Sequence, residues 1–379
     1  MSAPSATKIF VIGGTGAQGL PVVRGLVSDG KYSCRILTRD SNSPRAKGLL
    51  ALGNIELFEG SFMNEEDLRR GYRGCDGAYI NIDGFNCGEK TETFWAMRAY
   101  ELAIEDGGIR FFVYGNLDYV YRKSGYNPIF RTGHYDGKGR VGEWVLAQHA
   151  SNRELYSDRY KMGVALFTLG PYIEMTISRG SPMTPSVEED EDGEKALTWR
   201  VPLGAEGAVV HVALDDCAHY VRWLFENPSR ANGMNLEVAV EHIKYAELAK
   251  AFERVTGHRA RFIDVDMDTY WRTGPMSAYA DNLAGYGADR NDPATMTVKQ
   301  NFTGFWNMWR HSGNNRGIIQ RNYALLDEIH PHRIRSAEEF LRKQNESGLK
   351  AGKGSLWERV QPEKIAPVLK NHEDGRRAS

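Results

Sequence analysis

Residues 8–19 read KIFVIGGTGAQG, and this stretch decides the fold class. Its first five residues are a mostly apolar run that predicts a buried strand, and apolar residues recur at helical spacing from Leu20 to Val27. The glycines in between satisfy the GxGxxG pattern, which gives a tight turn and lets a pyrophosphate approach the main chain. The N-terminus of the next helix also attracts an anion. We therefore expect a dinucleotide to contact Gly13, Thr15, Gly16, Ala17, Gln18 and Gly19.

Strand and helix signals go on alternating as far as Leu169. This alternation is typical of a parallel sheet with right-handed crossovers. Further strands are predicted at 33–38, 55–58, 77–82, 111–114 and 164–169, and helices at 44–52, 65–72, 91–105 and 137–149. The predicted fold class is α/β, a Rossmann-type doubly wound parallel sheet with a smaller C-terminal α+β substrate or effector domain.

The domain boundaries follow from the change of rhythm after Leu169. Residues 1–170 are predicted to form the NAD(P)-binding domain, and residues 206–240 are expected to return to it. Residues 171–205 and 241–350 would form the second domain. Residues 351–379 have many charged residues and few apolar ones, so we expect a mobile tail.

Composition excludes several classes of protein. The net charge is −1, and the sequence has no basic stripe, so we do not expect direct binding to nucleic acid. No apolar run approaches the roughly 20 residues that span a bilayer, so no membrane partner is expected. No export signal is visible, and the four cysteines lack metal-ligand spacing. We expect a cytoplasmic protein without a metal site, and a homodimer or a regulatory protein partner stays open.

The residue after the second strand selects the cofactor. Arg39 follows Thr38, and a guanidinium there suits the 2′-phosphate of NADP(H), whereas an acid would hold the ribose of NAD(H). Arg45 and Lys47 add positive charge nearby. NADP(H) is the favoured cofactor. NAD(H) remains the alternative, because Asp40 could instead contact the ribose.

Other candidate site residues follow later strands. The carboxyl ends of parallel strands meet at one edge, where ligands bind. Residues at this edge that could contact cofactor or substrate are Asn81, Ile82, Asn116, Tyr119, Pro171 and Tyr172.

The sequence resembles the NmrA-like branch of the atypical short-chain dehydrogenase/reductase superfamily. The resemblance rests on GGTGAQG at 13–19, LTRD at 37–40, HYDGKGR at 134–140 and TLGPYIEM at 168–175. It implies a Rossmann domain with a smaller second domain. It also implies a functional split, because some members reduce small metabolites and others sense the dinucleotide and co-regulate transcription.

The catalytic pair of the wider superfamily is out of register. Typical members place a proton-donating Tyr four residues before a Lys that holds the nicotinamide ribose. Here His134 has that spacing from Lys138, and Tyr135 is one residue too close. The resemblance implies that Lys138 holds the ribose. His134, Tyr135 or Tyr119 could supply a proton, and Asn116 stands where many relatives have Ser.

The predicted function is an NADPH-dependent reductase of a small organic metabolite, by hydride transfer from nicotinamide C4. Without the usual Tyr, a cyclic imine or a conjugated carbonyl of secondary metabolism is favoured, because an iminium already carries the charge that a ketone must develop. The alternative is a non-enzymatic redox sensor. The aromatic residues Tyr270, Trp271, Phe302, Phe305, Trp306 and Trp309 either wall a substrate pocket or, for most of them, form the core of the second domain.

Overall fold

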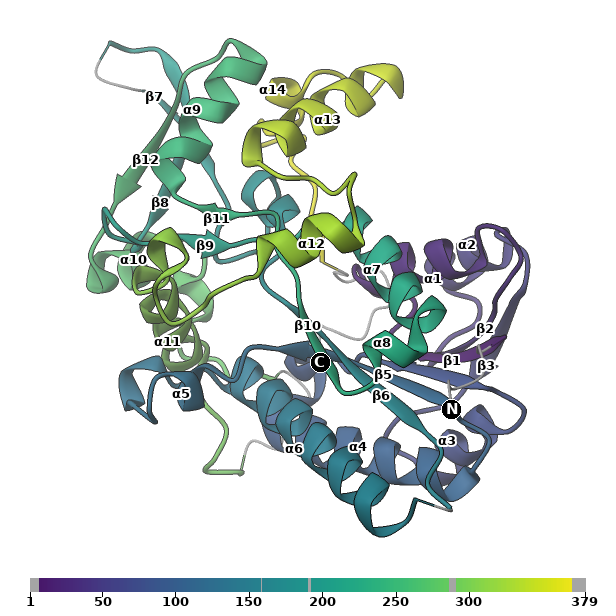
Figure 1. Cartoon of the computed structure of the whole chain (residues 1–379). Coiled ribbons are helices and arrows are strands. Elements are labelled where there is room, and N and C mark those ends of the chain that lie inside the picture. The colour runs from purple at the N-terminus through teal and green to yellow at the C-terminus, as the bar shows by residue number, and fades with distance from the viewer. Residues whose placement is uncertain (1–6, 158, 190–191, 286–290, 370–379) are drawn as a thin grey trace.

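A seven-stranded parallel sheet forms the centre of one half of the molecule, which residues 8–169 and 214–237 build (Figure 1). The computed structural model describes residues 7–157, 159–189, 192–285 and 291–369. The strand order is β10-β6-β5-β4-β1-β2-β3, so the order reverses between β1 and β4. A doubly wound sheet opens a ligand crevice at such a point. The strands are β1 (Lys8–Ile12), β2 (Ser33–Thr38), β3 (Ile55–Glu59), β4 (Gly77–Ile80), β5 (Phe111–Leu117), β6 (Gly163–Leu169) and β10 (Met234–Glu237).

Helices cover both faces of this sheet, as Figure 1 shows. Successive side chains of a strand point to opposite faces, so Ile9 and Val11 pack toward α1 (Gly19–Val27) and α7 (Leu214–Glu226). Phe10 packs on the other face, in one apolar cluster with side chains of the helices there. Those helices are α3 (Glu65–Tyr72), α4 (Gly84–Asp106) and α6 (Gly133–Leu155). The shorter helices of this half are α2 (Pro44–Leu50), α5 (Val120–Lys123) and α8 (Pro228–Ala231). The predicted α/β class is confirmed.

The second half combines small sheets with helices. One sheet has three strands, β7 (Ser186–Glu189), β8 (Lys195–Val201) and β12 (Ala260–Asp264), and β9 (Val209–Val210) pairs with β11 (His242–Ile243). The helices are α9 (Tyr245–Thr256), α10 (Met267–Thr273), α11 (Val298–Arg310), α12 (Tyr323–Ile329), α13 (Ala337–Lys350) and α14 (Leu356–Arg359). The aromatic residues singled out above all lie in one buried cluster, so the interpretation as core is confirmed.

Two predicted helices begin too late. The helix expected from residue 91 starts at Gly84 and is interrupted by Gly88, which has φ 79° and ψ 162°. The helix expected from residue 137 starts at Gly133. Glu89, near the start of α4, accepts from Arg131, just before α6, and from Arg140 on α6. Apolar periodicity does not reveal helix starts that such polar contacts hold.

Part of the expected mobile tail is packed. Leu356 and Val360 are buried, and the Arg179 amide donates to the Ala366 carbonyl oxygen at 3.2 Å. The expectation of a loosely attached segment is therefore wrong for residues 355–367. The rest of that segment, residues 370–379, lies outside the described residues. In the described parts of the chain, no helix has the length and apolarity to cross a bilayer.

Candidate functional site

The glycine turn between β1 and α1 is held by close backbone contacts. Gly13 has φ 84°, and a Cβ on it would lie 2.3 Å from the carbonyl oxygen of Asn81. A Cβ on Gly19 would lie 2.0 Å from the Gly13 carbonyl oxygen. Both positions therefore require glycine for the fold itself. Gly16 differs, because its nearest neighbour would be the Gly13 carbonyl oxygen at 3.2 Å.

Backbone donors are free in this turn. Within the described residues, the amide N–H groups of Thr15, Ala17 and Gln18 donate to no protein atom, whereas the Gly16 amide donates to the Gly13 oxygen at 3.0 Å. Free amides at the start of a helix form an anion site. These donors suit a pyrophosphate, and a Cβ on Gly16 would meet a single protein atom within 4 Å.

The side chain of Gln18 is part of the scaffold. Its amide nitrogen donates to the hydroxyl of Tyr79, and its oxygen accepts from the hydroxyl of Tyr172 at 3.2 Å. Burial raises the pKa of both tyrosines, so both stay neutral. Pro171 is fixed as well, since its carbonyl oxygen lies 3.1 Å from Nδ1 of His211. The structure thus joins the predicted residues Gln18 and Tyr172 across the glycine turn.

Positive side chains flank the turn at the end of β2. Arg39 is exposed, while Asp40 accepts from the Asn42 amide at 2.8 Å within its own loop. Arg45 on α2 donates to the Thr15 carbonyl oxygen at 3.4 Å. An exposed guanidinium here suits a ribose phosphate better than a bare ribose. The residues present therefore fit a phosphorylated dinucleotide.

Lys138 on α6 is fixed by two oxygens. Its Nζ donates to the Ile82 carbonyl oxygen at 2.7 Å and lies 2.7 Å from Oε1 of Glu92. Glu92 is fully buried, and burial raises its pKa, although the ammonium of Lys138 opposes that shift. Sequence reasoning missed Glu92, because Glu89 and Glu92 both stand in the polar start of α4 and no spacing sets either apart.

His134 and Tyr135, at and next to the position of the superfamily Tyr, have different surroundings. His134 Nδ1 lies 3.0 Å from Oδ1 of Asn301, and burial lowers its pKa to about 4, so the ring is neutral at neutral pH. Tyr135 is only 2% exposed and packs against Phe305 and Trp309, and burial raises its pKa. Neither side chain is an acid of ordinary strength near neutral pH.

Asn116 and Tyr119 both contact α6, the helix that carries His134, Tyr135 and Lys138. The Asn116 amide nitrogen donates to Oγ1 of Thr168 at 2.8 Å, and a Cβ on Gly142 would lie 2.6 Å from its oxygen. Gly142 lies one helical turn after Lys138 on the same face. Tyr119 contacts α6 at Gly139, where a Cβ would lie 2.4 Å from its Cα. All five predicted catalytic residues therefore lie on α6 or against it.

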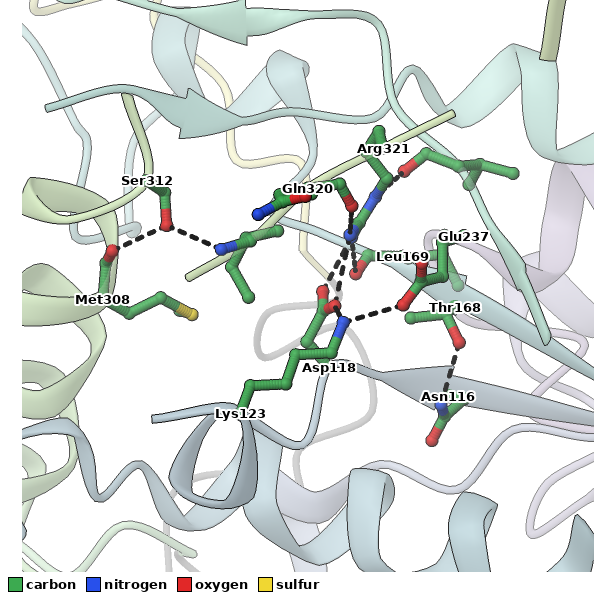
Figure 2. A network of polar contacts seen from close by, with 12 residues as sticks. Asn116, Asp118, Lys123, Thr168, Leu169, Glu237, Met308, Ser312, Gln320 and Arg321 are labelled. Carbon is green, nitrogen blue, oxygen red and sulfur yellow. Dashed lines mark hydrogen bonds and ion pairs between the residues drawn. The ribbon is translucent and has the colours of Figure 1, made fainter. Parts of the chain in front are cut away.

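A buried ion pair joins the two halves beside the end of β5 (Figure 2). Arg321 Nη2 lies 2.7 Å from Oδ2 of Asp118, and both side chains have no exposed surface. Lys123 contacts Asp118 at 2.6 Å and Glu237 at 2.8 Å. Burial alone would raise the pKa of Asp118, but the two cations outweigh it and lower the pKa to about 2. Sequence reasoning missed this pair because 203 residues separate its members.

A cavity of about 400 Å³ is lined by His134, which lies one helical turn before Lys138. The starts of α4 and α6 bound it together with Ala284, Asp292 and residues of 294–301, and Phe85 is also on its wall. No group of three or more His, Cys, Asp or Glu side chains among the described residues could hold a metal ion.

The chain is similar to several known proteins. The NmrA-like family model matches residues 5–286. An NmrA-like family domain-containing oxidoreductase of Aspergillus hancockii is 27% identical over 267 residues, which are 68% of this chain and 76% of the relative. A similar oxidoreductase of Cladobotryum sp. is 26% identical over 266 residues, covering 67% and 75% of the two chains.

Solved structures share the fold. One is NmrA, a negative transcriptional regulator, in complex with NAD, with a TM-score of 0.67, 16% identity and coverage of 93% of this chain and 100% of that chain. Another is the triphenylmethane reductase of Citrobacter sp. with NADP(H), with a TM-score of 0.61, 14% identity and coverage of 89% and 99%.

Proposed function

The chain belongs to the NmrA-like family, and on that premise we propose that it is an NADPH-dependent oxidoreductase that reduces a small organic metabolite. The observation that carries the proposal is the glycine turn, where the amides of Thr15, Ala17 and Gln18 have no acceptor among the described residues. A Cβ on Gly16 would meet a single protein atom there, the Gly13 carbonyl oxygen at 3.2 Å. The oxidoreductase names of the fungal relatives and the dinucleotides in the structural neighbours support it.

Each end of the dinucleotide has a matching group on this chain. Thr15, Ala17 and Gln18 would donate their amides to the pyrophosphate, and Arg39 would bind a 2′-phosphate. Lys138, held by Glu92 and the Ile82 carbonyl oxygen, would donate to the nicotinamide ribose. The bound cofactor supplies the hydride, from C4 of the nicotinamide.

The candidate site has no strong proton donor at the usual position, and this favours certain substrates. His134 is neutral and Tyr135 is buried, so strong acid assistance is missing at the usual place. An iminium already carries positive charge before hydride arrives, and correct positioning then contributes most of the rate. We therefore favour a cyclic imine or a conjugated carbonyl compound as substrate.

The test is consumption of NADPH, followed by its near-ultraviolet absorbance, with a panel of cyclic imines, enones and aldehydes. Turnover with one of them should fall at least about 100-fold in Lys138→Ala, which corresponds to roughly 2.7 kcal/mol of transition-state binding. The matched control is Lys250→Ala, because Lys250 is exposed on α9 and forms an ion pair with Glu247 on the same helix. The control should retain full activity.

A redox sensor is the second candidate. The observation that favours it is the absence of an ordinary acid at the position of the superfamily Tyr. Tight NADPH binding together with no turnover across the whole panel would contradict the reductase and support the sensor.

A further inference from the structure

The wall of the cavity lined by His134 is rich in rings and thioethers. Phe85, Met97, His134 and Met296 line it. The ring centroids of Phe85 and His134 are 4.6 Å apart, and Phe302 stacks on Phe85 at 5.9 Å with an interplanar angle of 7°. A fixed cluster of rings favours a flat, conjugated ligand that stacks on it.

The charges around the cavity cancel in pairs. Glu89 accepts from Arg131 at 2.6 Å and from Arg140 at 3.0 Å, and Lys90 lies 3.3 Å from Asp292. Arg131 also reaches a further carboxylate, that of Asp136, at 2.8 Å. Each of the three cations on the wall, Lys90, Arg131 and Arg140, therefore pairs with a carboxylate, and Arg131 also pairs with one that is buried behind the wall, so no unpaired cation among the described residues of the wall faces an ionised ligand.

His134 lines this cavity and has one free acceptor. Its backbone amide donates to Oδ1 of Asn301 at 3.3 Å, which fixes the oxygen of that carboxamide toward the histidine. Nδ1 lies 3.0 Å from the same oxygen, so Nδ1 carries the ring proton. In the neutral ring, Nε2 then keeps its lone pair, and within the described residues it has no protein partner.

We propose that this cavity binds the substrate as a neutral, planar, conjugated molecule that donates an N–H or O–H hydrogen bond to Nε2 of His134. This assignment rests on the proposed function, because Lys138 lies one helical turn after His134 and would place the nicotinamide beside the cavity. His134 is then a residue that selects the substrate by accepting a hydrogen bond, and it is not the proton donor.

A matched pair of ligands tests the assignment. Calorimetry with 2-naphthol and 2-methoxynaphthalene, which differ in one hydroxyl hydrogen and a methyl group, is carried out on the NADPH-saturated protein. We expect 2-naphthol to bind at least about fivefold more tightly, which corresponds to about 1 kcal/mol for one hydrogen bond. His134→Phe retains a ring but loses the acceptor, so it should bind both ligands equally.

A second measurement covers the case in which the variant does not fold. In the wild-type protein, the ¹⁵N shift of His134 Nε2 should move on addition of 2-naphthol and stay in place with 2-methoxynaphthalene. Equal binding of both ligands, an unchanged preference in His134→Phe, or no saturable binding of either would overturn the assignment. The NADPH affinity of the same samples reports separately on the proposed function, since its loss contradicts that function and leaves the ligand comparison readable.

Discussion

The carboxylate of Glu92 lies 2.7 Å from the ammonium of Lys138, and Glu92 has no exposed surface. A buried carboxylate is stable there only with its counter-charge, so the pair holds Lys138 against the Ile82 carbonyl oxygen at the cofactor edge. Glu92 is therefore a positioning residue for Lys138.

Glu92→Gln should reduce the free energy of unfolding by about 2 kcal/mol, because Lys138 loses its counter-charge while an acceptor remains. NADPH affinity should fall as well, because Lys138 is no longer held in place. Urea unfolding and calorimetry measure the two effects. Glu65→Gln, at an exposed ion pair with Arg98, is the control and should leave both quantities unchanged. Unaltered NADPH affinity in Glu92→Gln would show that Glu92 does not position Lys138.

Asp118→Asn should destabilise the protein by about 3 kcal/mol, because Arg321 is left buried without its main acid. The low pKa of Asp118 means that its stabilisation is present above the unfolded value of 3.8 and is lost as the pH falls through about 2. A double-mutant cycle with Arg321→Met, followed by urea unfolding, measures the coupling. Additive effects of the two substitutions would contradict a direct interaction.

Glu174 should make the protein less stable in alkali. Its Oε1 accepts from the Leu214 amide at 3.0 Å, and burial raises its pKa to about 8, with Asp215 and Asp216 adding repulsion. A raised pKa gives stabilisation that is complete below the unfolded value of 4.5 and is lost as the pH rises through about 8.

Glu174→Gln should therefore unfold like the wild type at about pH 5 and be more stable at about pH 9. We expect a gain of about 1–2 kcal/mol, since the side chain retains some exposure. Thermal unfolding across that range measures it. Parallel pH profiles of the two proteins would refute the shift.

The imidazole of His134 should stay neutral throughout the physiological range. Because burial lowers its pKa to about 4, its ring resonances should not titrate between about pH 6 and pH 8. The stabilisation that neutral His134 contributes is present above pH 6.5, the pKa of the unfolded state, and is lost as the pH falls through about 4. NMR of the imidazole nitrogens detects this directly, with the urea-unfolded protein as reference. A titration midpoint near that of the urea-unfolded protein would contradict the lowered pKa and support His134 as the proton donor.

Much of the fold could be predicted from local sequence. The strand at 33–38 and the helix at 65–72 have regular apolar periods or clear end signals, and their bounds agree with the structure. The starts of α4 and α6 were missed, because their polar side chains gain stability from partners in three dimensions. Periodicity does not report such partners.

The candidate site was predictable only where backbone geometry defines it. Gly13, Gly19 and the edge residue Asn81 come together as the motif implies. Glu92, Asn301 and Arg321 were missed, since each acts on a site residue from another element and carries no motif. Asn116 was expected at the site, and its side chain contacts α6 at Gly142, one helical turn after Lys138, while its amide nitrogen donates to Thr168.

Calorimetric titration of NADPH into the wild type and Gly16→Ala tests whether the glycine turn between β1 and α1 binds the dinucleotide. A Cβ at Gly16 meets only one protein atom, at 3.2 Å, so the variant should fold, but the methyl group would occupy the space reserved for the pyrophosphate. We expect NADPH to bind the wild type saturably and Gly16→Ala at least about tenfold more weakly, which is a loss of about 1.4 kcal/mol of binding free energy. Folded wild-type protein that binds neither NADPH nor NADH would contradict it.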